Sequence, residues 1–300
     1  MLSGHGGGGG GEDGDIGPGR EAVNPVAAKH FIVKGGRCTY IARNGNPARH
    51  GPLGRRKHRR NSWKFSFARP IAANSGTERI LPMINFEQCR RNMVESQLRP
   101  NKVTDEAVLS AMGYVPREVF AGPQFEGIAY VDEDIPLGDG RYLMEPMVLA
   151  RLLQAANIGA DDVILDIGCG SGYTAAVCAR ICATVVAVES DPRLARETTR
   201  IMGELEADNV VVVDGPLKDG YAAQAPYDVI VFSGAVPEIP EGVLDQLSEG
   251  GRLVAVLEGE EGWGHAVLAR NVGGTVSREV IFDASIPELP GFDREVGFVF

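Results

Sequence analysis

Short apolar runs alternate with segments of helical spacing along the chain from Met83 onward. The apolar runs predict five strands, at residues 163–165, 184–188, 210–213, 227–232 and 252–257. The segments between them predict three helices, at residues 173–182, 192–205 and 242–247. Because strands that alternate with helices form a parallel sheet with helices on both faces, we predict an α/β fold with a doubly wound, mostly parallel, Rossmann-like sheet.

Helical spacing and proline positions predict how the chain reaches the first strand. The apolar residues of 84–99 follow a helical period that Pro100 ends, and Thr104 is placed to be the N-cap of a second helix. Residues 121–146 are rich in Gly, Pro and Asp, which is typical of loops. Pro146 fits the first turn of a third helix. We expect residues 83–150 to form a mostly helical N-terminal part of the domain.

The C-terminal region predicts an antiparallel finish to the sheet. After residue 263 the pattern is a strand, a turn at Gly273-Gly274 and a second strand. Residues 295–300 alternate as well and predict a last strand. We therefore expect 83–300 to be a single domain.

The first 82 residues differ from this body. Residues 6–11 are an uninterrupted glycine run, and residues 55–60 form a basic cluster. The cluster is compatible with a nucleic-acid-binding or localisation tail. The composition favours a disordered leader, or a non-native extension before a natural start at Met83, because glycine-rich polar sequence cannot build a core.

Charge and cysteine content restrict the partners of the body. Residues 1–82 hold 14 Lys and Arg against 5 Asp and Glu, whereas 83–300 hold 16 against 35. So acidic a body is a poor general binder of nucleic acid, because phosphate contacts need Lys and Arg. No apolar run approaches the ~18–20 residues of a membrane span, so we expect no membrane partner. Five cysteines without paired zinc-like spacing predict no metal site and favour the reducing cytoplasm.

The loop after the first predicted strand carries the clearest chemistry. It reads Asp-Ile-Gly-Cys-Gly-Ser-Gly, follows a strand and opens a helix, which is the context that a ligand-binding loop requires. Glycines let the backbone turn sharply and approach a ligand closely. The predicted cofactor-binding residues of this loop are Asp166, Gly168, Cys169, Gly170, Ser171 and Gly172.

A second acid, Glu189, ends the next predicted strand, where it can accept hydrogen bonds from ribose hydroxyls. A nicotinamide dinucleotide is the main competing ligand, but the third glycine of GxGxxG is absent and Asp166 would face the pyrophosphate. No Lys or Arg lies between Arg151 and Arg180 to offset that repulsion. A ligand with a cationic centre and no phosphate fits better. S-adenosylmethionine (SAM), which has a sulfonium, an ammonium and a ribose, is such a ligand.

Two further positions are candidates at the same edge of the sheet. Asp214-Gly215 follows the third predicted strand, where an acid can reach an adenine amino group, although such a pair is equally typical of an ordinary turn. Ser233 follows the fourth strand, and its small side chain would leave room for a ligand in the crevice.

From Met83 to the C-terminus the chain resembles the protein-L-isoaspartate (D-aspartate) O-methyltransferases. The resemblance combines the glycine loop with several other segments, so it is more specific than the loop alone. The matching segments are Met93–Leu98 in the opening helix, Val115–Glu118 with Phe120, Ala129-Tyr130, Leu165–Ala176 around the loop, Ala225–Asp228, Pro237–Pro240 and Gly250–Val254.

The resemblance implies methyl transfer from SAM to the carboxylate of an isoaspartyl residue in damaged protein. Such an acceptor has a pKa near ~3.9 and is ionised at neutral pH, so no general base is needed. The body accordingly carries only one histidine, His265, and no nucleophile-base pair. An enzyme that mainly aligns acceptor and methyl donor can do without one.

One stretch departs from the family pattern. The family carries Thr-Ile-Ser before Gln-Pro, with its hydroxyls at substrate and cofactor, whereas this chain has Tyr142-Leu143-Met144 before Glu145-Pro146. By this match Tyr142 and Met144 take the positions of the catalytic hydroxyls, and Glu145 adds a negative charge beside an acidic acceptor. Two alternatives therefore stay open: a methyltransferase with another acceptor, and a non-catalytic SAM-binding regulatory module.

Overall fold

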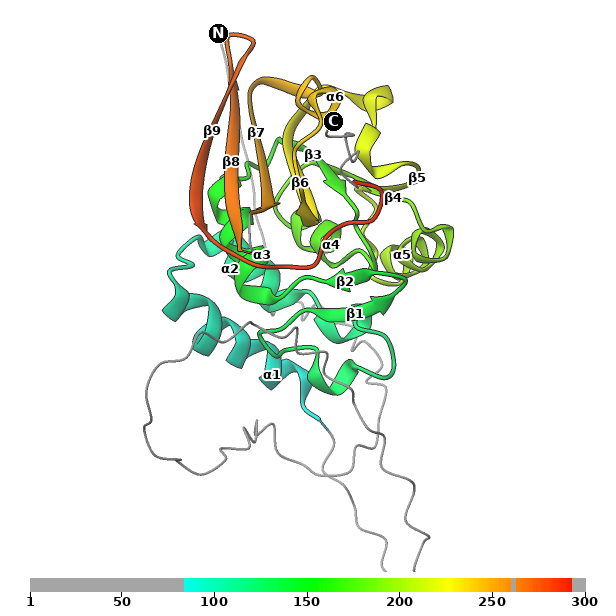
Figure 1. The fold of residues 1–300 in the computed structure, drawn as a ribbon. Helices are drawn as coiled ribbons and strands as arrows, with labels where there is room; N and C mark the ends of the chain where they lie inside the picture. Colours follow the sequence, from blue (N-terminus) through cyan, green and yellow to red (C-terminus); the bar gives the residue numbers. More distant parts are fainter. Residues whose placement is uncertain (1–83, 260–262, 293–300) are drawn as a thin grey trace, which may run out of the picture. The chain divides into compact units, whose positions relative to one another are not determined.

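The computed structural model describes residues 84–259 and 263–292 of the 300-residue chain (Figure 1). All described residues belong to one compact unit, Ile84–Phe300. The leader predicted at 1–82 and the strand predicted at 295–300 lie outside the described residues. No helix among the described residues is both long and apolar enough to cross a membrane.

The centre of the unit is a seven-stranded sheet in the order β5-β4-β3-β6-β7-β8-β9. The first five strands in this order are parallel, β8 is antiparallel to β7, and β9 is antiparallel to β8. The predicted doubly wound sheet with an antiparallel finish is confirmed. Its strands are β3 (Val163–Ile167), β4 (Thr184–Glu189), β5 (Val210–Asp214), β6 (Tyr227–Val236), β7 (Leu247–Glu258), β8 (Gly264–Val272) and β9 (Thr275–Asp283).

Helices cover both faces of this sheet, which explains why its central strands are mostly apolar runs rather than alternating apolar and polar residues. Ile164 belongs to the core cluster that includes side chains of α3 (Pro146–Ala156), α4 (Tyr173–Ala179) and α5 (Pro192–Glu204). Leu165, which points to the opposite face, belongs to the cluster that includes α6 (Glu241–Leu244). The two faces thus bury alternate residues of the same strand.

The N-terminal part begins with α1 (Phe86–Met93), which continues through a π-helical turn, Val94–Leu98, and a 3-10 turn, Arg99–Asn101. This agrees with the helix predicted to end at Pro100. The next helix is α2 (Glu106–Tyr114), but Thr104 is not its N-cap. The Asp105 carboxylate caps it, because one oxygen accepts hydrogen bonds from the amides of Ala107 and Val108.

The prediction that residues 121–146 are all loop is wrong at its C-terminal end. Ile135–Gly138 (β1) and Arg141–Leu143 (β2) form an antiparallel hairpin in which Ile135 pairs with Leu143 and both are buried. Strands of three and four residues, one of them containing a proline, are too short to show a period. The hairpin exists because its inward side chains pack on the core.

Other elements differ from the prediction only at their ends. The helix α4 stops at Ala179, and α6 is one turn that gives way to β7 at Leu247. The strand β6 extends to Val236, beyond the predicted residue 232. The extension matters because residue 235 pairs with Glu288 of the segment that follows β9.

The segment after β9, residues 284–292, runs back across the carboxyl ends of the strands. In Figure 1 it is red, and the β1–β2 hairpin lies next to it. An ideal Cβ at Gly168, just after β3, would lie 2.8 Å from the Leu289 side chain, and one at Gly170 would lie 3.1 Å from Leu137 of β1. Two segments distant in sequence therefore meet over the glycine loop.

Candidate cofactor site

The glycine loop joins β3 to α4 through three residues in the left-handed region, Gly168, Gly170 and Gly172, with φ of 77°, 58° and 95°. The loop is held against the end of β4, because the amide of Gly168 donates to the carbonyl of Val188 over 2.9 Å. The Thr198 hydroxyl of α5 donates to the Gly170 carbonyl over 2.8 Å. Glycine is needed here for its backbone conformation as well as for a ligand's approach.

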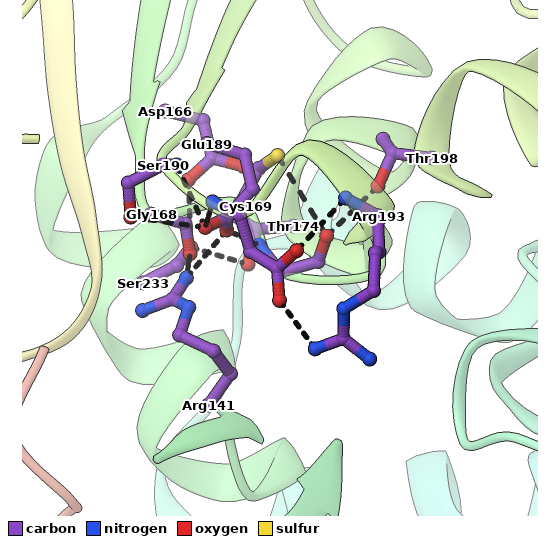
Figure 2. A network of polar contacts seen from close by, with 12 residues as sticks. Arg141, Asp166, Gly168, Cys169, Thr174, Glu189, Ser190, Arg193, Thr198 and Ser233 are labelled. Carbon is purple, nitrogen blue, oxygen red and sulfur yellow. Dashed lines mark hydrogen bonds and ion pairs between the residues drawn. The ribbon is translucent and has the colours of Figure 1, made fainter. Parts of the chain in front are cut away.

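Asp166 lies fully buried near the end of β3 and faces Ser233 of β6 (Figure 2). The Ser233 hydroxyl donates to Asp166 Oδ1 over 2.6 Å and lies 2.9 Å from the hydroxyl of Thr174. Asp166 Oδ2 has no hydrogen-bond partner among the described residues. Burial raises the pKa of Asp166 to about 7. Ser233 is thus not merely small, as its sequence position implied, but is the hydrogen-bond partner of this acid.

Glu189 lies at the end of β4 and is also fully buried. Its Oε1 accepts hydrogen bonds from the amides of Ser190 and Asp191 at 2.8 and 3.0 Å. Its Oε2 accepts from the amide of Gly170 at 2.8 Å and from Arg141 at 2.7 Å. Each oxygen of the Glu189 carboxylate therefore already accepts from at least two protein donors in this conformation.

Arg141 of β2 lies in the site, although its sequence position did not predict it there. Its Nη2 donates to the Gly168 carbonyl over 2.6 Å and to Glu189 over 2.7 Å, and the side chain is 2% exposed (Figure 2). The residues on either side of the loop, between Arg151 and Arg180, contain no Lys or Arg. A single arginine in a segment expected to be loop gave no signal. The site formed by the glycine loop, Asp166 and Glu189, which we call the cofactor cradle, is therefore not purely anionic.

Asp214 and Gly215 lie at the same edge of the sheet. Asp214 pairs with Glu189 across β5 and β4, and the Gly215 amide donates to the Glu189 carbonyl over 3.0 Å. The Asp214 side chain is exposed. It lines an open depression of about 280 Å³ between β5 and α5, together with Pro192, Ala195, Arg196, Thr199 and Val212.

Tyr142 and Met144, the positions matched to the family hydroxyls, lie beside the glycine loop. Tyr142 is partly exposed and Met144 is buried, and both line a cavity of about 10 Å³ that Ser233 also lines. The buried Arg117 holds this stretch, because its Nη2 donates to the Met144 carbonyl over 2.7 Å. Its guanidinium also lies 4.8 Å from the centre of the Tyr173 ring.

Two acids next to this stretch, Asp132 and Asp134, stabilise the start of α3. Asp134 accepts a hydrogen bond from the Glu145 amide, and Asp132 accepts one from the Met147 amide, so both engage the first turn of α3. Burial, followed by the charge of Asp134, raises the pKa of Glu145 to about 7. Near neutral pH Glu145 is therefore partly protonated, which weakens the repulsion that its sequence position implies for an acidic acceptor.

The chemistry of these groups fits SAM, although their present arrangement leaves little space. Asp166 keeps one buried oxygen without a partner, Ser171 keeps a buried hydroxyl without one among the described residues, and the loop bends where a ligand's backbone contacts would form. The Rossmann-like sheet and the acid-flanked glycine loop define the class of SAM-dependent methyltransferases, as predicted.

Comparisons with known proteins identify the family. A profile of the protein-L-isoaspartate(D-aspartate) O-methyltransferases (PCMT) matches residues 88–280. The chain therefore belongs to this family, whose members are SAM-dependent protein carboxyl methyltransferases, and the predicted family, enzyme class and cofactor are confirmed.

Individual relatives have the same assignment. The chain is 41% identical over 172 residues to the protein-L-isoaspartate O-methyltransferase of Methanoculleus marisnigri, covering 56% of this chain and 78% of that one. It is 39% identical over 188 residues to the enzyme of that name from Gloeobacter violaceus, covering 62% and 92%.

Two solved structures share the fold. A protein-L-isoaspartate O-methyltransferase superposes with a TM-score of 0.60 at 24% identity, over 68% of this chain and 67% of that one. A putative one from Plasmodium falciparum, in complex with S-adenosyl-L-homocysteine, superposes with a TM-score of 0.56 at 19% identity, over 69% of this chain and 99% of that one.

Proposed function

We propose that this protein transfers the methyl group of SAM to the free carboxylate of an isoaspartyl residue in damaged protein. The observation that carries the proposal is the family match, which spans both the N-terminal helices and the sheet. An acceptor carboxylate is ionised at neutral pH, so the chain needs to supply alignment rather than a base.

The roles of the chain's own residues follow from their positions. Asp166, Gly168, Cys169, Gly170, Ser171, Gly172 and Glu189 form the cofactor cradle, with Ser233 orienting Asp166 and with Asp214 and Gly215 at its outer end. SAM, when bound, supplies the electrophilic methyl group. An ionised Asp166 favours a cationic ligand, because opposite charges attract strongly in a buried site.

The acceptor side is formed by the stretch that departs from the family pattern. Tyr142 provides a phenol and Met144 an apolar surface where the family has two hydroxyls. Arg117 is a positioning residue here, because it holds the Met144 carbonyl while its own side chain is inaccessible. Recognition of an acidic acceptor near pH 7 benefits from the partly protonated Glu145.

A labelled-methyl assay tests the proposal. The protein is incubated with methyl-labelled SAM and a pair of peptides that differ only in carrying isoaspartate or aspartate at one position. We expect a base-labile methyl ester on the isoaspartyl peptide alone. Asp166→Asn should lower turnover by about tenfold to a hundredfold, since a charged interaction of 1.5–3 kcal/mol is lost.

The matched control is Arg270→Gln, which removes an exposed ion pair with Glu279 on β8 and β9 and should leave turnover unchanged. SAM binding with no ester on the isoaspartyl peptide would reject this acceptor. Labelling of other proteins in a lysate would then favour a different acceptor, and no labelling at all would favour a non-catalytic SAM-binding module.

We further propose that the protein acts in a reducing compartment such as the cytoplasm, where damaged protein is its partner. The buried Cys169, Cys178 and Cys182 are free thiols, which supports this proposal. The excess of acidic residues in 83–300 disfavours nucleic acid as a partner, because phosphate contacts need Lys and Arg.

A further inference from the structure

Two side chains from separate segments fill the cofactor cradle. Arg141 reaches it from the β1–β2 hairpin, and Leu289 reaches it from the segment after β9. A Cβ added at Gly168 would lie 2.8 Å from Leu289 and 3.1 Å from Nη2 of Arg141, so both side chains lie against the same glycine. Both are nearly inaccessible to solvent.

The C-terminal segment is docked by backbone hydrogen bonds rather than lying loosely. The Ala235 amide donates to the Pro287 carbonyl over 2.9 Å, and the Leu289 amide donates to the Ala235 carbonyl over 2.8 Å. A Cβ at Gly234 would lie 2.6 Å from the Leu289 side chain. Leu289 therefore lies against Gly168, just after β3, and Gly234 of β6, and a ligand-binding crevice needs such glycines for close approach.

The side chains of Arg141 and Leu289 leave little space in the cofactor cradle. The cavity that Arg141, Leu289, Ser233 and Gly234 line measures about 10 Å³, whereas pockets for cofactor-sized molecules measure roughly 300–1,000 Å³. A nucleoside the size of SAM cannot occupy the crevice until at least one of the two side chains leaves.

The positive charge of Arg141 has a second effect. The guanidinium forms an ion pair with the Glu189 carboxylate, and a cationic ligand would have to approach against that positive charge. The hydrogen bonds of Arg141 are incomplete, because its Nε has no hydrogen-bond partner among the described residues. The Arg141 side chain therefore occupies the cradle in the manner of a competing cation that the chain itself provides.

We propose that Arg141 and Leu289 form an internal plug, and that the cofactor binds only to the form in which the β1–β2 hairpin and residues 284–292 have withdrawn. This rests on the proposed function, since it concerns access to the SAM cradle. Affinity for the cofactor is then the intrinsic affinity reduced by the fraction of molecules that are open.

Binding and hydrogen exchange test the plug together. Calorimetry measures the affinity of the wild type, Arg141→Gln and Leu289→Ala for S-adenosylhomocysteine and for SAM. Amide hydrogen exchange without ligand follows residues 135–143 and 284–292. Arg270→Gln, an exposed arginine with one carboxylate partner, is the matched control for Arg141, and Val280→Ala, an exposed apolar residue of β9, is the control for Leu289.

We expect each plug variant to bind S-adenosylhomocysteine at least about tenfold more tightly than the wild type and to exchange faster in both segments. Arg141→Gln should improve SAM binding more than S-adenosylhomocysteine binding, because only SAM carries the sulfonium charge, whereas Leu289→Ala should improve both equally. The two control variants should match the wild type. Leu289→Ala leaves the Arg141–Glu189 pair intact and remains informative if Arg141→Gln fails to fold.

Two negative results have different meanings. Wild-type binding that neither variant tightens, with unchanged exchange in both segments, would overturn the plug and leave the proposed function standing. Absence of binding by every form, including variants whose exchange shows that they are open, would overturn the proposed function and the plug with it.

Discussion

Replacing Gly172 by alanine tests the physical basis of the glycine loop. Gly172 has φ of 95°, and an added Cβ would lie 2.5 Å from Thr198 Cγ2 and 2.8 Å from Met202 Cε. The left-handed backbone costs an L-residue roughly 1–2 kcal/mol, and forcing a methyl group into a packed site costs roughly 1–3 kcal/mol. We therefore expect Gly172→Ala to lower the free energy of unfolding by about 2–5 kcal/mol.

Gly203 provides the matched control within the same structure. It lies in α5, outside the left-handed region, and an added Cβ would have nothing within 4 Å. Gly203→Ala should stabilise the protein by about 0.5–1 kcal/mol, because alanine loses less backbone entropy in a helix. Urea denaturation measures both changes as shifts of the midpoint at constant slope.

A double variant separates the two costs. Thr198→Ser removes Cγ2, the nearest obstacle, while it keeps the hydroxyl that donates to the Gly170 carbonyl. Combined with Gly172→Ala, it should recover the part of the packing cost that comes from Thr198 and leave the backbone cost and the contact with Met202. Equal stability of Gly172→Ala and Gly203→Ala would refute the reasoning, since it would mean that neither the backbone conformation nor the contact with α5 constrains residue 172.

Three further changes address the buried polar groups. Arg117→Met should lower the free energy of unfolding by about 2–4 kcal/mol in the same assay, because it leaves the carbonyls of Ala129 and Met144 without their donor; an unchanged midpoint would contradict this. Glu189→Gln should cost about 3–5 kcal/mol by leaving the Arg141 charge unpaired, and a stabilised variant would refute the inference. Burial raises the pKa of Asp166, so the stability that its protonated form contributes is complete below about pH 4 and lost as pH rises through about 7; denaturation at pH 5 and pH 8 should show a smaller loss in Asp166→Asn than in the wild type, and an equal loss would contradict the assignment.

Local sequence determined the central sheet and the glycine loop. Every residue of an apolar run such as Val185–Val188 is buried, so the run predicts a central strand from local sequence alone. The loop is equally local, because Gly168, Gly170 and Gly172 each supply the left-handed backbone that the turn from β3 into α4 needs. Asp166 and Glu189 meet because the carboxyl ends of adjacent parallel strands share an edge.

The N-cap of α2 was harder to predict, because two neighbouring residues compete for that role. Thr104 and Asp105 are both good N-cap residues, and only the backbone conformation decides which side chain reaches the first amides of α2. Gln154 of α3, a residue far away in sequence, accepts hydrogen bonds from the amides of both Thr104 and Asp105 and from the Thr104 hydroxyl, whereas the Asp105 carboxylate accepts from the first amides of α2. The β1–β2 hairpin likewise shows no period of its own, because its stability comes from Ile135 and Leu143 packing on other elements.

The contents of the cradle were decided by tertiary structure alone. Arg141 lies 48 residues before Glu189, and Leu289 comes near the end of the described chain, far from the hairpin in sequence although next to it in space. No pattern in either segment specifies that an arginine will neutralise the predicted ribose acid, or that a leucine will lie on two glycines. Sequence determines which groups a strand and its turn present, because those effects act over a few residues. Which side chains occupy the space above them depends on how distant segments pack, and only the folded chain sets that.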